Sequence, residues 1–124
     1  MINVKIAVAG TGYVGLVTAV CLSEIGHEIT CIDIDKDKIE LMKKGISPIY
    51  EADVERLMKK NQKRLNYTTD YKKAYDQSDV IFIGVGTPER NDGSANLEYV
   101  YDVCRQIKKS SKSDKVIVIK STVP

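Results

Sequence analysis

A glycine-rich segment, Gly10-Thr11-Gly12-Tyr13-Val14-Gly15, is the strongest chemical signal in the sequence. The apolar run at residues 5–9 predicts a strand before it, and the apolar stretch at residues 13–25 predicts a buried helix after it. In that setting the first glycine permits a tight turn, the second lets the backbone approach a diphosphate, and the third lets the helix pack against the sheet. The N–H groups and dipole at a helix start attract phosphate. The sequence therefore predicts a dinucleotide-binding turn.

Asp33 is the second residue that points to this chemistry. It follows the predicted strand at residues 29–32 and lies 23 positions after Gly10, close to the ~20 expected for the acid that contacts an adenosine ribose. Its carboxylate can accept hydrogen bonds from both ribose hydroxyls and would repel a 2′-phosphate, which favours NAD over NADP. Lys36 and Lys38 weaken that preference, since a nearby cation can tolerate a phosphate. A similar fold that binds another nucleotide, or none, is the alternative.

Short apolar strands alternate with helices along the rest of the chain. Strands are expected at residues 5–9, 29–32, 65–68, 80–84 and 116–119. Helices are expected at residues 13–25, after a cap at Asp35, around 54–58 and at 97–107, with a loop over 86–96. This alternation predicts an α/β fold of the Rossmann type: a doubly wound, mainly parallel sheet in the order 3-2-1-4-5, with helices on both faces. At 124 residues, one domain is expected.

The charge balance excludes several classes of partner. With 19 basic and 17 acidic side chains, the net charge is +2, so neither nucleic acid nor a membrane surface is an expected partner. The paired lysines are expected on solvated helix faces. No apolar run approaches the ~18–20 residues that span a bilayer.

The cysteines and the single histidine are predicted to have structural roles. Cys21, Cys31 and Cys104 show no metal-ligand spacing, and their apolar neighbours predict core positions and a reducing, cytoplasmic setting. His27 follows Gly26 and is expected in a surface turn. We expect no metal site.

Several segments in order along the chain carry a family resemblance. Residues 10–16 and 26–35 resemble the N-terminal part of the UDP-glucose/GDP-mannose dehydrogenase family. Ser47–Glu51, Val85–Pro88 and Lys120–Pro124 match it too, and Asp92-Gly93-Ser94-Ala95 followed by Leu97 resembles its UDP-glucose branch. After Glu51 the chain has Ala52-Asp53 where the family commonly has Pro-Gly, so we expect Asp53 to cap the next helix.

The resemblance implies an oxidoreductase that converts the C6 alcohol of a nucleotide sugar into a carboxylate, with two hydride transfers to two NAD molecules. For the UDP-glucose branch the product is UDP-glucuronate, a precursor for polysaccharide biosynthesis. The resemblance places Tyr13 and Val14 beside the pyrophosphate and Asp33 with Lys38 at the adenosine ribose. It also places cofactor contacts where the fourth and fifth strands end: Val85, Gly86, Thr87 and Thr122.

The family's catalytic residues are not expected in this chain. The resemblance implies a cysteine nucleophile far downstream, in a second domain, together with a Lys, an Asn and an Asp that also lie beyond residue 124. None of the three cysteines present is expected to replace it, because all sit in apolar settings. We therefore expect residues 1–124 to be the N-terminal NAD-binding domain of a larger homodimeric enzyme, inactive alone, whose partner is a small-molecule nucleotide sugar.

Two alternatives remain at this point. The same family includes enzymes for GDP-mannose and for UDP-N-acetylhexosamines, so the sugar stays open. A Rossmann-type regulatory domain of a potassium channel or transporter, which senses nucleotides without chemistry, has a similar length and glycine turn. The segments at residues 85–88 and 120–124 favour the dehydrogenase over the sensor.

Overall fold

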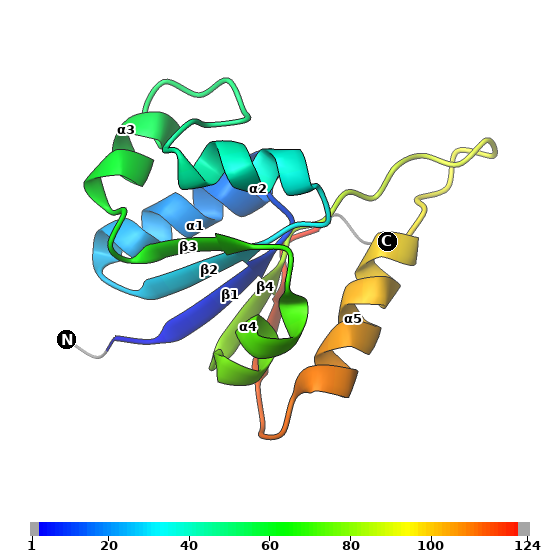
Figure 1. The fold of residues 1–124 in the computed structure, drawn as a ribbon. Helices are drawn as coiled ribbons and strands as arrows, with labels where there is room; N and C mark the ends of the chain where they lie inside the picture. The colour runs from blue at the N-terminus through cyan, green and yellow to red at the C-terminus, as the bar shows by residue number, and fades with distance from the viewer. Residues whose placement is uncertain (1–2, 122–124) are drawn as a thin grey trace.

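A five-stranded parallel sheet forms the centre of the computed structural model, which describes residues 3–121 (Figure 1). The strands are β1 (Lys5–Ala9), β2 (Glu28–Ile32), β3 (Leu65–Thr68), β4 (Val80–Ile83) and β5 (Val116–Ile119). Their order is β3-β2-β1-β4-β5, and every neighbouring pair is parallel. The predicted order is thus confirmed. Because all strands run the same way, their carboxyl ends lie along one edge of the sheet.

Five helices cover the two faces of the sheet. They are α1 (Tyr13–Ile25), α2 (Lys36–Lys43), α3 (Val54–Lys60), α4 (Tyr71–Gln77) and α5 (Glu98–Ser110). Buried side chains of α1, α2 and α3 belong to one core cluster, and those of α4 and α5 belong to a second. The doubly wound arrangement is confirmed. None of the described helices combines the length and the apolar character needed to cross a bilayer.

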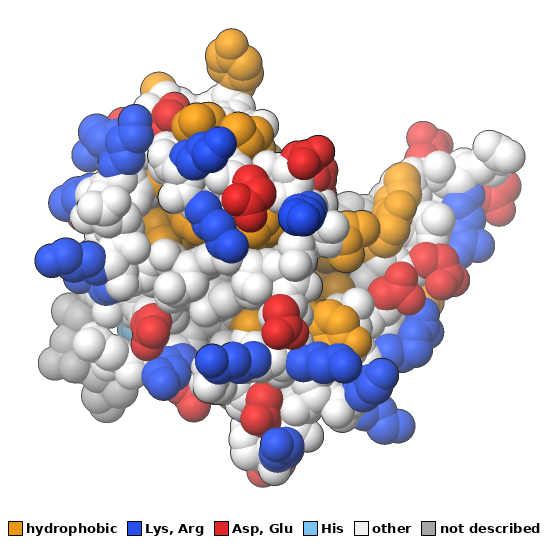
Figure 2. All heavy atoms as spheres, viewed as in Figure 1, with side chains coloured by type: hydrophobic (Ala, Val, Ile, Leu, Met, Phe, Trp, Pro, Cys, Tyr) orange, Lys and Arg blue, Asp and Glu red, His pale blue; other side chains and the backbone are white. Residues whose placement is uncertain are grey.

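The lysine pairs lie on the surface, as predicted. All eight side chains are exposed: Lys43, Lys44, Lys59, Lys60, Lys72, Lys73, Lys108 and Lys109. Figure 2 shows basic and acidic side chains interspersed over the drawn face, with several basic side chains in a row across its lower part. Some lysines lie close to an acid on the same helix. The Lys43 Nζ and a Glu40 carboxylate oxygen, for example, are 3.8 Å apart.

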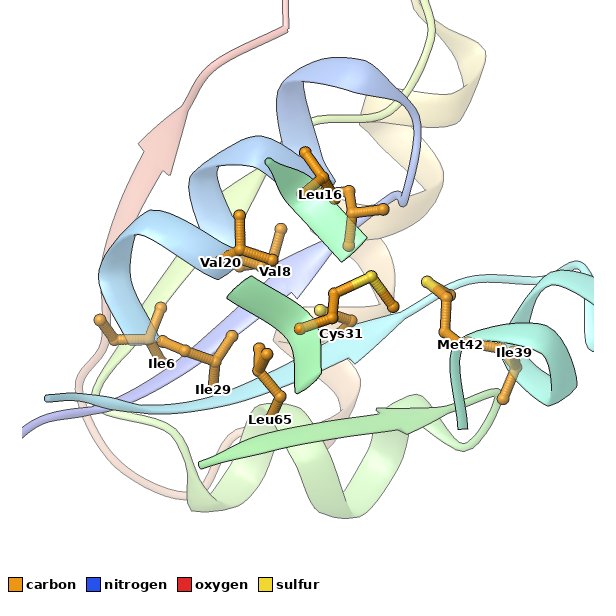
Figure 3. Packing of buried hydrophobic residues seen from close by; sticks show 12 residues of the cluster. Ile6, Val8, Leu16, Val20, Ile29, Cys31, Ile39, Met42 and Leu65 are labelled. Atoms are coloured by element: carbon orange, nitrogen blue, oxygen red, sulfur yellow. The ribbon is translucent and has the colours of Figure 1, made fainter. Parts of the chain in front are cut away.

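Alternating side chains of each central strand supply the two cores. In β1, Ile6 and Val8 face the α1 side, whereas Ala7 and Ala9 face the α4 side. Figure 3 shows Val8 beside Val20 and Ile6 beside Ile29, with Leu16 and Cys31 in the same cluster. A strand buried on both faces needs apolar residues at every position, which explains the uninterrupted apolar runs in the sequence.

Several helix ends follow local sequence signals. Gly26 has φ +116° and ends α1, a left-handed conformation that glycine adopts without strain. The Asp35 side chain accepts hydrogen bonds from the backbone N–H groups of Asp37 and Lys38, so it caps α2 as predicted. Asp53 precedes α3, but its side chain makes no capping hydrogen bond among the described residues. It accepts a hydrogen bond from Arg56 at 3.3 Å instead, so Asp53 has the predicted N-cap position without the capping hydrogen bond.

Three further predictions about individual side chains need correction. Cys21 and Cys104 are exposed rather than buried. On α5 the buried face passes through Val100, Val103 and Ile107, and Cys104 lies beside that face. His27 is half-buried, and its Nδ1 accepts a hydrogen bond from the N–H of Val4 at 3.1 Å, so it secures the start of β1. Only Cys31 occupies the predicted core position.

Candidate cofactor-binding site

A crevice of about 620 Å³ lies at the carboxyl ends of the strands. Its walls come from the turn after β1, the ends of β2 and β4, and one face of α5. Figure 2 shows apolar side chains gathered in the hollow between the body of the molecule and α5. Ligands of open parallel sheets bind at this edge, where the strand order reverses between β1 and β4.

The crevice brings together ten of the twelve residues predicted to bind the cofactor. They are Gly10, Thr11, Gly12, Tyr13, Val14, Asp33, Lys38, Val85, Gly86 and Thr87. Gly15 is buried beneath the turn and does not line the crevice. Thr122 lies outside the described residues. One crevice therefore contains the glycine turn, the β2 acid and the β4 loop.

The three glycines of the turn have different environments. Gly10 has φ +96°, and a Cβ there would lie 2.8 Å from the carbonyl oxygen of Gly84. A Cβ at Gly15 would overlap the carbonyl oxygen of Gly10, so close packing of α1 on the sheet requires glycine. At Gly12, by contrast, a Cβ would meet no described protein atom within 4 Å. The space at Gly12 is therefore left open beside the crevice, as a bound diphosphate requires.

The start of α1 has no side-chain cap among the described residues; α3 and α5 also lack one, but unlike α1 they have an acid in the first turn, Glu55 and Glu98. Gly12 is its N-cap residue, and no side chain of the described residues bonds to the first turn. The first turn also contains no acidic side chain. By contrast, Asp35 caps α2 and Asp70 caps α4. The unpaired N–H groups and the positive dipole end of α1 are thus available to an anion in the crevice.

The Asp33 carboxylate is held by three hydrogen bonds from its own chain. Its Oδ2 accepts from the backbone N–H of Thr11 at 3.0 Å and from the Thr11 hydroxyl at 2.5 Å. Its Oδ1 accepts from the backbone N–H of Asp35 at 2.9 Å. The carboxylate is therefore oriented at the crevice before any ligand arrives. Lys38 lies nearby on the first turn of α2, where its own N–H is bonded to Asp35.

Sequence reasoning missed one wall of the crevice. Tyr99, Asp102, Val103 and Gln106 line it from α5. These residues are three and four positions apart, so they lie on one face of α5. That face mixes polar and apolar side chains, so it shows no clear periodicity in the sequence, whereas the buried face does. Ser121 also lines the crevice, and its hydroxyl donates to the carbonyl oxygen of Val85 at 2.8 Å, which ties the end of β5 to the β4 loop.

The loop after β4 extends from the body of the molecule beside the crevice (Figure 1). Glu89 pairs with Ala95 across it, and Gly93 has φ +87° at its tip. The Asp92 carboxylate accepts hydrogen bonds from the Ser94 hydroxyl at 2.6 Å and the Ser94 N–H at 3.0 Å. These bonds lower the pKa of Asp92 below its ordinary value. The predicted loop at residues 86–96 is therefore an ordered turn.

A second cavity, of about 650 Å³, lies between α2, α3 and β3. Its walls include Lys43, Lys44, Lys59 and Lys63. It contains none of the residues predicted to bind the cofactor, and it lacks a glycine turn or an uncapped helix start. The crevice at the carboxyl ends of the strands is therefore the candidate site.

Comparison with known proteins agrees with this geometry. Residues 4–124 match the UDP-glucose/GDP-mannose dehydrogenase family, NAD binding domain. The chain belongs to this family. It is 59% identical over 122 residues to UDP-glucose 6-dehydrogenase YwqF of Bacillus subtilis and 48% identical over 123 residues to UDP-glucose 6-dehydrogenase of Rhizobium meliloti. In each case 97% of the chain matches and spans 28% of the relative's length.

Solved structures of the dehydrogenase family have the same fold. A GDP-mannose dehydrogenase from Pseudomonas aeruginosa, solved as a ternary complex, superposes with a TM-score of 0.92 at 44% identity. That match covers 96% of this chain and 28% of that one. A UDP-glucose dehydrogenase from Pyrobaculum islandicum gives a TM-score of 0.95 at 33% identity, over 99% of this chain and 30% of that one. The chain is thus an NAD-binding domain of this family, and the alternative of a channel regulatory domain is wrong.

Proposed function

We propose that NAD binds in the crevice with its diphosphate against the first turn of α1. Tyr13 and Val14 lie beside the diphosphate there, and Gly12 leaves room for it. Asp33 and Lys38 contact the adenosine ribose, and residues 85–87 contact the part of NAD that crosses the carboxyl end of β4. We propose that Thr122 contacts this same part of NAD. The observation that carries the proposal is the combination of open space at Gly12 with an uncapped α1.

When bound, NAD supplies the hydride acceptor, and the residues of this chain bind and orient it. No cysteine lines the crevice among the described residues. Cys31 is buried in β2, where burial and the charge of Asp33 raise the pKa of its thiol to about 12. It therefore stays protonated near neutral pH and cannot attack a carbonyl carbon. The covalent chemistry of the family is accordingly proposed for a part of the protein beyond residue 124.

For the whole protein we propose oxidation of UDP-glucose to UDP-glucuronate with reduction of two NAD. The identity of 59% to a Bacillus subtilis UDP-glucose 6-dehydrogenase supports this substrate. GDP-mannose is the second candidate, because a GDP-mannose dehydrogenase is 44% identical. Two UDP-N-acetylmannosamine dehydrogenases are 29% and 26% identical, which makes an N-acetylated sugar the weaker choice.

Two further aspects of the whole protein follow from the same proposal. We infer a homodimer that acts on a small-molecule nucleotide sugar, with neither nucleic acid nor membrane as partner. We also infer a cytoplasmic location, supported by three cysteines present as free thiols, the state that a reducing compartment maintains.

Isothermal titration calorimetry with NAD tests the role of the domain. The chain should bind NAD, and Asp33→Ala should weaken binding by about 1–3 kcal/mol because it removes an acceptor for the ribose. Equal affinity of the two proteins would contradict the assigned orientation. For the whole protein, NADH absorbance is measured with each nucleotide sugar in turn. About two NADH per UDP-glucose, and little with GDP-mannose, is the expected result; the reverse preference would establish the second candidate.

A further inference from the structure

Thr11 connects the glycine turn to the acid at the end of β2. Ala9 and Ile32 are register partners at the ends of β1 and β2, and Gly10 N–H extends the pairing to the Ile32 carbonyl at 2.8 Å. The next N–H group, that of Thr11, donates its hydrogen bond to the Asp33 carboxylate rather than to a backbone carbonyl of β2. The Thr11 hydroxyl donates to the same oxygen at 2.5 Å, and its residue is only 1% exposed. A buried side chain therefore holds the group proposed to contact the ribose.

The three hydrogen bonds limit what the carboxylate can still do. A carboxylate offers about four acceptor positions, two on each oxygen. Thr11 occupies both positions on Oδ2, and the Asp35 N–H occupies one on Oδ1. About one position then remains, on Oδ1, so the carboxylate can accept from one ribose hydroxyl rather than from both as the sequence predicted. The carboxylate cannot rotate about its side-chain bonds without breaking these contacts.

This restraint matters most for a ligand with a 2′-phosphate. A mobile carboxylate could swing away from the phosphate and become solvated, so the acid alone would discriminate weakly. A held carboxylate keeps its negative charge beside the phosphate, and close like charges repel strongly in a partly desolvated crevice. Discrimination therefore depends on the group that holds the acid as well as on the acid itself.

We propose that Thr11 is a positioning residue that fixes the Asp33 carboxylate and thereby sets the preference for NAD over NADP. This inference rests on the proposed binding of NAD in the crevice. Thr11 acts through Asp33 and through no direct contact of its hydroxyl with the cofactor.

Three variants isolate the hydroxyl of Thr11. Thr11→Val keeps the shape and the backbone N–H but removes the hydroxyl, whereas Thr11→Ser keeps the hydroxyl. Thr18→Val is the control for the same substitution elsewhere, because Thr18 is a half-buried threonine of α1 that does not line the crevice. Calorimetry gives the Kd of each protein for NAD and for NADP.

The ratio of the NADP Kd to the NAD Kd is the decisive quantity. Thr11→Val should lower it by about threefold to tenfold, the size expected for loss of one hydrogen bond to a charged group that acts indirectly. Thr11→Ser and Thr18→Val should leave it within about twofold of the original protein, a change too small to represent a hydrogen bond. A merely structural role would weaken both dinucleotides equally, and an unchanged ratio would overturn the proposal.

A double-mutant cycle tests whether Thr11 acts through Asp33. In the Asp33→Ala background, Thr11→Val should no longer change the ratio. If it changes the ratio there as much as in the original protein, the proposed route through Asp33 is wrong.

Hydrogen exchange of the Thr11 amide tests the restraint without any ligand. The amide should be protected in the original protein and in Thr18→Val, and should exchange about tenfold faster or more in Asp33→Ala, which removes its acceptor. Equal protection in all three would overturn the restraint while leaving the proposed function intact. Absence of binding of either dinucleotide to the original protein would overturn the proposed function, and the selective role of Thr11 with it.

Discussion

Replacement of Gly12 by alanine should weaken cofactor binding without harming the fold. The residue has φ −74° and ψ −167°, an extended conformation that alanine adopts readily. The added Cβ would meet no described protein atom within 4 Å. We therefore expect the free energy of unfolding to change by less than about 0.5 kcal/mol, as for a substitution without steric conflict.

The loss of binding can be estimated from the helix start. The new methyl group would stand between the diphosphate and the first-turn N–H groups of α1, which no side chain of the described residues caps. Loss of one hydrogen bond from these groups to a charged phosphate costs about 1.5–3 kcal/mol. This corresponds to a Kd for NAD that is about 10-fold to 150-fold higher.

Calorimetry with NAD and urea unfolding, both on the same preparation, measure the two effects. Gly15→Ala is the matched control, because its Cβ would overlap the Gly10 carbonyl oxygen. That variant should lose about 1–3 kcal/mol of stability or more, the penalty for overpacking. Unchanged NAD affinity of Gly12→Ala, or a stability loss similar to that of Gly15→Ala, would refute the assignment of the diphosphate to this turn.

Three other outcomes follow from contacts away from the glycine turn. Hydrogen bonds from Asn61 and Lys60 hold the pKa of Glu24 below its ordinary value of 4.5. Its contribution to stability is therefore present above pH 4.5 and lost as the pH falls through the lowered pKa, so Glu24→Gln should flatten urea-unfolding profiles in that acid range. Asp35→Ala should cost about 1 kcal/mol of stability in the same assay, because the N-cap of α2 is lost; no change would show that the cap is dispensable. A thiol reagent at neutral pH should modify Cys31 far more slowly than the two exposed cysteines, since burial raises the pKa of its thiol to about 12; equal rates, followed by mass spectrometry, would contradict the buried position.

The sheet and the crevice were predictable because several signals agreed. Runs such as Val80–Ile83 are too apolar for any place except a strand covered on both faces. The glycine turn between a strand and a helix specifies a diphosphate site by backbone geometry alone. The acid at the end of β2 then follows from the strand order, which puts the ends of β1 and β2 side by side.

The features that could not be predicted are determined by individual tertiary contacts, which leave no pattern in the sequence. Helix α4 contributes only Ala74 and Tyr75 as buried residues in seven positions, so the sequence contains no readable periodicity for it. Cys104 is next to the buried Val103, and a rotation of one position along α5 decides which of them faces the core. The hydrogen bonds from Thr11 to Asp33 join residues 22 positions apart, so no local pattern indicates them.

The candidate site is defined by polar groups that the chain leaves without partners of its own. Helices α2 and α4 begin with an aspartate that bonds to their first turn, and neither helix start is part of the glycine turn. Helix α1 begins with glycine, and the Asp33 carboxylate, which lines the same crevice, accepts hydrogen bonds from Thr11 and Asp35 instead. Had Asp33 capped α1, its negative charge would occupy the position that attracts the diphosphate. In the proposed complex with NAD, the interaction with Thr11 keeps the acid at the ribose and leaves the helix start open to phosphate.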